Sequence, residues 1–461
     1  MKYLVSALML APLWAHTSVE ILDSASERTV SPMLNGMHQV YSYASDDLYK
    51  DGAIAQWAKS SNIPNCRFPG GTIVKFWDWE SPTGLRFSKE VRSDLHRWDP
   101  EWKPEYQVPA SQWMSLDEHL DFLKKAQMKT PILGVNLISG IRYEKEQEAI
   151  DKAVRMAEYV KSKGYEGAWY YLGNEEVHMH AEEGSFPVRI AAYAQRFARY
   201  ARALKAVDPT CKTFWNLNEV TPKTLAVFLE NDEGTSDGVE THGKYPYYSN
   251  NEDHPLVSFE DWQQQFPLQH LKPYDTYTWR NKADQLRARA TAMGRLGYLV
   301  TDFEWGWHGH RARGFNGYTQ SLALIELGME LIIGGYDASC YWDTQIGYGL
   351  FDYQNRPRAH ALAMAMLSSA LGETYLEIQT TNPQVHGFAV QKAKTAEMFL
   401  INKSSLPVSL SVSKGEKTYA ILKGEVIRNA GDNRFGEQKE LLIHEGKVTL
   451  PPLSFARLVL R

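Results

Sequence analysis

The chain has 461 residues, of which 43% are hydrophobic and 23% charged, and its formal net charge at pH 7 is −5. This is the composition of a globular protein with room for one large domain and a smaller companion. The negative net charge argues against a general binder of polyanions, so we do not expect nucleic acid as a partner.

Residues 1–18 predict a signal peptide. Met1-Lys2-Tyr3 is a short charged start, the apolar stretch from Leu4 to Ala15 is too short to span a bilayer, and small residues follow. We therefore expect a secreted or periplasmic protein; the alternative is a buried N-terminal strand or helix. No later segment has the pattern of a membrane span.

Short apolar or β-branched runs then alternate with longer helical patterns. The helical spacing is clear at 150–160 and 190–207, and Ser115-Leu-Asp-Glu118 is a capping box ahead of another helix. Strands are predicted over 33–41, 65–68, 131–137, 168–172, 211–217, 238–242, 298–303 and 335–342. Eight strands with interleaved helices predict an α/β fold, a (β/α)8 TIM barrel over residues 31–373 with its active site at the carboxyl ends of the strands.

From residue 374 the pattern changes to alternating strands broken by turns, as at 398–402, 408–412 and 455–460. This predicts a small C-terminal antiparallel β-sandwich over 374–461. The strand-like segment 19–30, ahead of the barrel, is expected to join that sandwich.

Two glutamates stand where predicted strands end. Glu175 closes Trp169-Tyr-Tyr-Leu-Gly-Asn-Glu175, and Glu304 closes Tyr298-Leu-Val-Thr-Asp-Phe-Glu304. Hydrolysis of a glycosidic bond with retention needs one carboxylic acid to protonate the leaving oxygen and one carboxylate to attack the anomeric carbon, about 5–5.5 Å apart. A parallel barrel can bring two strand ends to that separation. The alternative is an ordinary helix cap with an acid favoured by the helix dipole, and the adjacent Glu176 is expected to point to solvent or to a surface lysine.

On these residues the chain resembles clan A glycoside hydrolases, in the branch of α-L-arabinofuranosidases, β-xylosidases and heparanase-like glucuronidases. Arg67-Phe-Pro-Gly-Gly71 followed by Trp77-Asp-Trp79, and Asn136 after the third strand, are similar to the arabinofuranosidases. Two departures concern the sugar. Gly36-Met-His-Gln-Val-Tyr41 lacks the glutamate that binds the furanose in those enzymes, and Glu176-Val-His-Met replaces their usual aspartate, proline and tryptophan.

The resemblance implies a role for each matching residue. Glu175 would be the general acid/base and Glu304 the nucleophile; Asn174 would hold the sugar 2-hydroxyl, and Arg67 would keep Glu304 ionised. Further contacts with the nucleophile or the sugar are expected from Asn136, His242, Tyr245, Trp77 and, as a stacking platform, Trp342.

Basic residues follow both carboxylates, as His178-Met-His180 and as His308-Gly-His310-Arg311-Ala-Arg313. If His178, His308 and Arg311 rim one cleft, they indicate a uronate or sulfated sugar near the cleaved bond. Alternatively the histidines cap helices and the arginines pair with Glu182 and Glu183. A metal on the two His-x-His pairs is a third possibility, but no carboxylate or cysteine completes a recognisable set.

The sequence therefore predicts a secreted retaining glycosidase that needs no cofactor or metal and acts on a plant or algal polysaccharide or oligosaccharide, in the manner of an α-L-arabinofuranosidase. One alternative is a hydrolase of acidic or sulfated glycans, of the uronidase or agarase/porphyranase type. The alternative outside enzymes is a catalytically inactive barrel that binds carbohydrate. The sugar, the linkage and the oligomeric state are not predicted.

Overall fold

The computed structural model describes residues 15–23, 28–40, 52–75, 77–80, 114–137, 146–178, 184–217, 220–245, 258–264, 279–307, 314–344, 348–352, 354–431 and 435–461.

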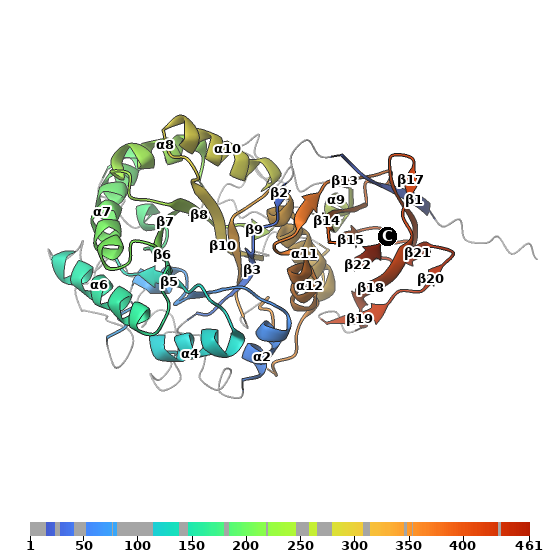
Figure 1. The fold of residues 1–461 in the computed structure, drawn as a ribbon, viewed down its shortest axis with the longest axis horizontal. Helices are drawn as coiled ribbons and strands as arrows, with labels where there is room; N and C mark the ends of the chain where they lie inside the picture. Colours follow the sequence, from blue (N-terminus) through green and yellow to red (C-terminus); the bar gives the residue numbers. More distant parts are fainter. Residues whose placement is uncertain are drawn as a thin grey trace, which may run out of the picture.

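In this described part of the chain, eight parallel strands form a closed barrel (Figure 1). The strands pair in the order β11-β3-β4-β5-β6-β7-β8-β10, and β10 pairs with β11 to close the ring. Their bounds are β3 Met33–His38, β4 Cys66–Phe68, β5 Ile132–Val135, β6 Trp169–Leu172, β7 Lys212–Leu217, β8 Gly238–Thr241, β10 Leu299–Trp307 and β11 Ala338–Trp342. The predicted strands are thus confirmed, and the seventh runs on to Trp307 instead of ending at Phe303.

Helices surround the barrel, as the predicted βα repeat requires (Figure 1). The capping box at Ser115 is formed, because its side chain accepts from the Glu118 N–H while the Glu118 carboxylate accepts from the Ser115 N–H. The bounds are α2 Ala53–Ser60, α4 Leu116–Ala126, α6 Glu146–Ser162, α7 Phe186–Val207, α8 Pro222–Asn231, α9 Phe259–Gln264, α10 Trp279–Ala292, α11 Gly317–Ile333 and α12 Ala359–Leu367, with 3-10 turns η1 Thr72–Lys75, η5 Glu176–His178 and η8 Ser368–Ala370.

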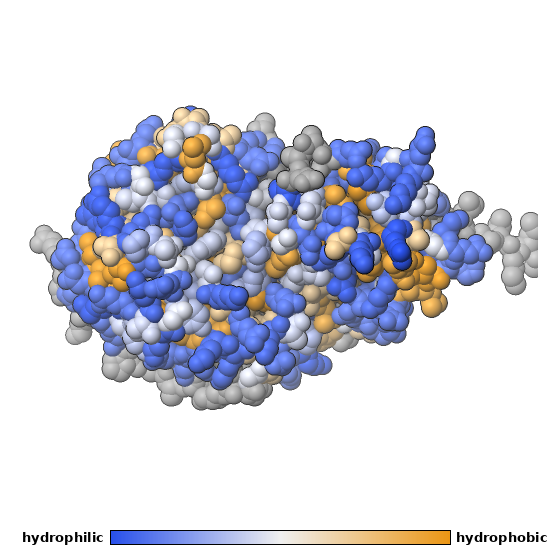
Figure 2. Space-filling model, in the orientation of Figure 1, coloured by the Kyte–Doolittle hydropathy of each residue, from blue (hydrophilic) through white to orange (hydrophobic). Residues whose placement is uncertain are grey.

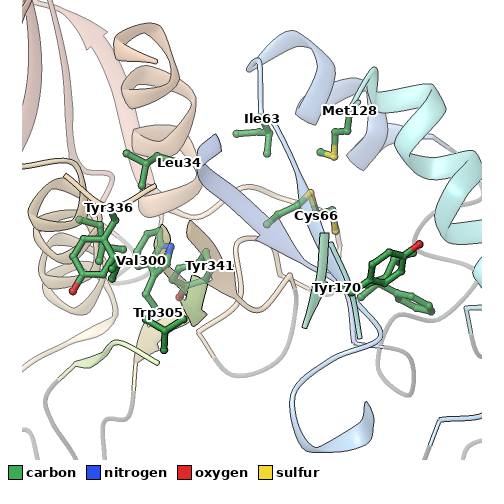
Figure 3. Close-up of a cluster of buried hydrophobic side chains, with 14 of the residues drawn as sticks. Leu34, Ile63, Cys66, Met128, Tyr170, Val300, Trp305, Tyr336 and Tyr341 are labelled. Atoms are coloured by element: carbon green, nitrogen blue, oxygen red, sulfur yellow. The ribbon is translucent and has the colours of Figure 1, made fainter. Parts of the chain in front are cut away.

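Side chains alternate between the two faces of each barrel strand. On β6, Tyr171 belongs to the cluster inside the barrel, while Tyr170 packs outward towards the helices. Figure 3 shows this outer layer, in which Tyr170 lies with Cys66, Trp305 and Tyr341. The interior is therefore a packed core, and a binding site has room only where the strands end.

Two sheets form the β-sandwich beside the barrel (Figure 1). One runs β13-β1-β16-β21-β20, with β17 on β16, and the other runs β19-β18-β22-β15-β14-β12-β2. The bounds are β1 Ala15–Ile21, β2 Arg28–Thr29, β12 Thr374–Leu376, β13 Ile378–Thr380, β14 Val385–Gln391, β15 Ala396–Asn402, β16 Val408–Lys414, β17 Lys417–Thr418, β18 Ile421–Asn429, β19 Gly436–Glu440, β20 Ile443–His444, β21 Lys447–Leu450 and β22 Ser454–Leu460. A barrel with a β-sandwich is the predicted fold class.

The chain ahead of the barrel contributes one strand to each sandwich sheet. β1 pairs in parallel with β16, from Ala15 opposite Val408 to Glu20 opposite Ser413, and β2 pairs with β12. The β1–β16 pair is an exception to the antiparallel sandwich that we predicted. β1 also begins inside the predicted signal peptide, whose end at residue 18 stays a prediction.

Helix α11 lies between the barrel and the sandwich (Figure 1). Except for half-buried Gln320, it is buried from Tyr318 to Ile332, because strands of both domains cover it, and this explains why most of its residues are apolar. Outside such contacts, Figure 2 shows a largely hydrophilic face with small hydrophobic groups. Among the described residues, no helix is both long and apolar enough to cross a membrane.

Candidate active site

The predicted catalytic residues meet at the carboxyl ends of the barrel strands. Arg67 lies in β4, Glu175 follows β6, His242 follows β8 and Glu304 lies near the end of β10. The register of β10 against β11 shifts between Asp302 and Trp305, so Glu304 sits in an irregular stretch of the strand. Such bulges often re-aim a side chain next to an active site.

Arg67 is fully buried and joins three of the strand ends. Its Nη1 donates to Glu304 Oε1 at 2.5 Å, and its Nη2 donates to Asn174 Oδ1 at 3.0 Å and lies 2.7 Å from Glu240 Oε1. The guanidinium lies over the Tyr171 ring, 3.9 Å from its centroid. Burial lowers the pKa of Arg67, but the carboxylates of Glu240 and Glu304 and the Tyr171 phenol outweigh it, so the pKa is raised. Arg67 therefore lies against Glu304 as a permanent cation.

The backbone of Glu175 is held in the left-handed region, with φ 51°. A non-glycine residue adopts this conformation at a cost, so neighbouring contacts must enforce it. Asn216 of β7 supplies them, because its Oδ1 accepts from the Glu175 N–H at 2.5 Å and its Nδ2 donates to the Gly173 carbonyl at 2.8 Å. We did not identify Asn216 from the sequence; an amide near the end of an otherwise apolar strand was the available signal.

His242 is buried and bridges the two predicted catalytic carboxylates. Its Nδ1 lies 2.6 Å from Glu175 Oε1 and 3.3 Å from Glu304 Oε2, and its Nε2 lies 3.2 Å from Glu240 Oε1. Burial lowers the pKa of His242, but the negative charge of Glu304 and the hydrogen bonds with Glu175 and Glu240 outweigh this and raise it to about 10. The imidazole is therefore a second cation in the site.

Glu240 is the residue of this site that the sequence reasoning missed most clearly. It lies in β8, is fully buried, and contacts both Arg67 and His242 through Oε1. A glutamate inside a buried barrel strand, two residues before a candidate histidine, was the signal that could have found it, because charged side chains are almost never fully buried unless they are paired.

One oxygen each of Glu175 and Glu304 and one nitrogen of His242 lie within 4.8 Å of one another. This is shorter than the carboxylate separation of inverting glycosidases, about 6.5–9.5 Å, and is compatible with that of retaining ones, about 5–5.5 Å. The spacing alone would also admit a metal ion. However, Arg67 lies 2.5 Å from Glu304 Oε1 and His242 lies 3.3 Å from Glu304 Oε2, and the positive charges of both side chains oppose a metal ion there.

Trp342 lies beside Glu304, as expected of a sugar platform at the end of the eighth strand. A Cβ added to Gly71 would meet Glu304 Oε1 at 2.4 Å and Trp342 Cζ3 at 3.4 Å, so both side chains lie next to this glycine, which leaves room for them. The Trp342 indole is partly exposed and packs edge-on against His38, with ring centroids 4.5 Å apart.

The structure corrects the expected role of Trp77. Its ring is buried in the core, edge-on to Phe68 at 5.2 Å, because the turn after β4 folds it inward. What it offers to the site is its backbone carbonyl, which accepts from Asn136 Nδ2 at 3.1 Å. Asn136, just after β5, is thereby held at the strand ends.

Glu176 also differs from the prediction, because it is fully buried and does not face solvent. The chain turns sharply at Gly173, with φ 75°, and the Glu176 side chain folds back over that glycine. Its Oε1 accepts from the Asn174 N–H at 3.1 Å and so stabilises the Asn174–Glu175 turn.

Four predicted site residues remain, and for these the structure gives only the backbone position or nothing. His178 ends η5, and Tyr245 ends the short strand β9 (Lys244–Tyr245), which pairs with β10. His308 and Arg311 lie outside the described residues, so a basic rim around the site stays a prediction.

Solved structures share this architecture over nearly the whole chain. The GH51 arabinofuranosidase from Xanthomonas axonopodis pv. citri matches with a TM-score of 0.66 and 13% identity, covering 97% of this chain and 100% of its own. A family 51 α-L-arabinofuranosidase from Bifidobacterium longum matches with a TM-score of 0.66 and 14% identity, covering 96% of this chain and 99% of its own. The GH30 subfamily 8 xylanase from Clostridium acetobutylicum matches with a TM-score of 0.56 and 13% identity, covering 96% of this chain and 99% of its own.

These structures belong to clan A of the glycoside hydrolases, and the resemblance expected from the sequence is confirmed at the level of the fold. No family model and no curated protein matches the sequence. With identities this low, the likeness establishes the architecture, and the chemistry has to be argued from the site.

Proposed function

We propose that the protein is a retaining glycosidase with Glu175 as acid/base and Glu304 as nucleophile. The observation that carries the proposal is the pair of carboxylates at the carboxyl ends of β6 and β10, with oxygens within 4.8 Å of each other and a buried arginine against Glu304. Glu304 faces two cations, Arg67 at 2.5 Å and His242 at 3.3 Å, whereas Glu175 faces His242 at 2.6 Å, and the larger positive charge around Glu304 is what an ionised nucleophile requires.

The chemistry would run in two displacements. Glu304 attacks the anomeric carbon while the proton of Glu175 passes to the leaving oxygen, which gives a glycosyl-enzyme ester. Glu304 thereby loses its negative charge. Glu175, now a carboxylate, takes a proton from water, and the hydroxide attacks the anomeric carbon and releases Glu304. The exposure of the two side chains suits these roles. Glu175, which must exchange a proton with the leaving group and with water, is 22% exposed, and Glu304 is 9% exposed.

We propose an uncharged plant or algal glycoside as the first substrate to test, with arabinofuranosides at the head of the panel. Arabinofuranosidases are among the structures that share the fold, and Trp342 offers a partly exposed ring beside Glu304. A uronide or sulfated glycan is the second candidate, on the basic residues that follow both glutamates. Arg311→Ala with Arg313→Ala should then lower hydrolysis of charged glycans alone, and unchanged hydrolysis of those glycans would remove this candidate.

The deciding experiment is hydrolysis of polysaccharides and aryl glycosides by wild type, Glu175→Gln and Glu304→Gln, with products followed by mass and by the NMR signal of the anomeric proton. Retained configuration and loss of activity in both variants is the expected result. Glu158→Gln, an exposed carboxylate on the outer helix α6, is the matched control and should hydrolyse like wild type. An inverted product, or turnover that survives in Glu304→Gln, would contradict the assignment; binding without turnover in wild type would favour an inactive carbohydrate-binding barrel.

We also propose that the N-terminal segment directs export and that the mature chain keeps β1. A cut after residue 18 would remove the residues that pair with Val408 to Ser411, whereas a cut no later than Ala15 leaves almost the whole strand. The N-terminal sequence of the exported protein tests this: it should begin no later than His16. A mature protein that begins at residue 19 would show that the sheet forms without this part of β1.

A further inference from the structure

The site contains one more carboxylate than a retaining mechanism uses. Glu240 is fully buried inside β8, two residues before His242, and its Oε1 lies 2.7 Å from Arg67 Nη2 and 3.2 Å from His242 Nε2. Burying a carboxylate is costly unless it is paired, so its presence calls for a function.

The hydrogen bonds fix where several protons lie. Arg67 has only donors, so Glu240 Oε1 accepts from it, and a permanent cation at 2.7 Å favours the carboxylate form of its partner. An ionised carboxylate can only accept, so His242 carries a proton on Nε2, which faces Glu240. The other ring nitrogen, Nδ1, faces the carboxylates of Glu175 and Glu304 and donates to them when the ring is charged. The raised pKa of His242 agrees with a ring that is charged at neutral pH.

The charged groups around His242 lie in or just after four of the barrel strands. Arg67 in β4 is positive, Glu240 in β8 and Glu304 in β10 are acidic, and Glu175 follows β6. Of the other groups nearby, burial holds the pKa of His38 well below its ordinary value, so that ring is neutral. Burial raises the pKa of Asp302 to about 6, and the positive charges of His242 and Lys282 act against this rise.

The balance of positive and negative charges in the buried cluster depends on Glu240. If Glu175 keeps its proton, the positive charges of Arg67 and His242 are matched by the negative charges of Glu240 and Glu304, and the charge of Asp302 is matched by that of Lys282. Without the charge of Glu240, two cations would face Glu304 alone. Glu175 would then be drawn into ionising as the second counter-ion, because a nearby positive charge favours the charged form of a carboxylic acid.

We infer that Glu240 is a positioning residue that keeps the acid/base protonated: as the buried counter-ion of Arg67 and His242, it frees Glu175 from that role and leaves Glu304 as the ionised nucleophile. The inference rests on the proposed function and adds to it a third carboxylate that touches neither the sugar nor the leaving group. Its effect is on the pH range over which Glu175 can donate a proton.

The test is the pH dependence of kcat/KM in Glu240→Gln, whose amide has the size of the carboxylate and can still accept from Arg67. The alkaline limb, where the acid/base loses its proton, should move to lower pH by about one unit or more. At pH 7, an aryl glycoside with a poor leaving group should lose more activity than one with a good leaving group, because only the first needs protonation. If Glu240 served packing alone, the substitution would lower the activity on both aryl glycosides equally and leave the pH of the alkaline limb unchanged.

His242→Gln is the matched variant with the opposite sign. It removes a cation beside Glu175, so the alkaline limb should move to higher pH. In the double variant, the pH of the alkaline limb should lie between the values of the two single variants. Shifts in the same direction in both single variants, or an unmoved limb in an active Glu240→Gln protein, would overturn the inference.

Wild type provides a test that needs no substitution. With 15N-labelled histidine, the resonances of His242 should show a doubly protonated ring between about pH 5 and pH 8. A ring that becomes neutral within that range would refute the charge count. Absence of hydrolysis of any glycoside by wild type would instead refute the proposed function, so the two failures can be told apart.

Discussion

Replacing Arg67 by methionine removes the permanent cation of the buried cluster and keeps a side chain of similar length. Glu240 and Glu304, whose side chains are 0% and 9% exposed, would then share only His242 as a counter-ion. Removing one partner of a buried ion pair costs about 3–5 kcal/mol. The protein can limit this by protonating one carboxylate, which costs about 1.36 × (7 − 4.3), or roughly 3.7 kcal/mol, at pH 7. We therefore expect the variant to lose about 3–4 kcal/mol of unfolding free energy at that pH.

The same reasoning predicts how the loss changes with pH. A carboxylate that stays protonated in the folded variant has a pKa raised above its unfolded value, so unfolding releases a proton and the variant becomes less stable as pH rises. At pH 5 the penalty should be only about 1 kcal/mol, which is roughly 2.7 kcal/mol less than at pH 7. If the proton resides on Glu304, the nucleophile is lost as well, so kcat should lie below that of wild type at every pH at which Glu304 stays protonated.

Urea unfolding followed by tryptophan fluorescence, at pH 5 and pH 7, measures this difference. Arg295→Met is the matched control: Arg295 contacts buried Asp232 at 2.9 Å, in a loop that precedes β10 and lies away from the strand ends that form the site. It should destabilise the protein and leave kcat unchanged. An Arg67→Met penalty that is equal at the two pH values, or an Arg67→Met protein with wild-type activity, would refute the charge argument.

Three further substitutions test other parts of the structure. Lys403→Met breaks a fully buried pair with Glu326 at 2.9 Å and should cost about 3–5 kcal/mol in chemical denaturation. Adding Glu326→Gln removes the unpaired charge and keeps an acceptor for the Trp262 indole N–H, so it should recover part of the loss, and no recovery would argue against the pair. Asn216→Ala removes the acceptor of the acid/base N–H, at 2.5 Å, and should lower kcat about tenfold or more with a smaller effect on KM; an unchanged kcat would show that other contacts hold that turn. Gly71→Ala places a methyl group 2.4 Å from the nucleophile carboxylate and should slow formation of the glycosyl-enzyme in pre-steady-state kinetics, whereas an unchanged burst rate would mean that the carboxylate moves aside freely.

Much of the fold could be predicted from the sequence because its signals are local. Alternation of short apolar runs with helical spacing gave the βα repeat, and the Ser115 capping box marked the start of α4. Glu175 and Glu304 could be found because each follows an apolar strand, and in a parallel barrel all such ends lie at one face. The position of Arg67 beside Glu304 came from the family resemblance, and the contact at 2.5 Å agrees with it.

The contacts of the site could not be predicted in the same way. In the sequence, Glu240 and Asn216 look like ordinary strand residues. Only the closed barrel brings Glu240 next to Arg67 and Asn216 next to the Glu175 N–H. Trp77 was expected at the sugar and Glu176 in solvent, and both expectations failed for the same reason. The turns after β4 and β6 fold these side chains inward, and those backbone conformations are not visible in residue type or spacing.

The sequence by itself therefore determined the order of the elements, the barrel with its companion sandwich, and two carboxylates at strand ends. Hydrophobic periodicity and capping depend on neighbours a few residues apart, which is why they can be inferred without a structure. The tertiary structure alone decided which groups share the buried site and how their charges balance. Those interactions join residues as distant as Arg67 and Glu304, and their strength comes from removing the whole cluster from water, which only the closed barrel achieves.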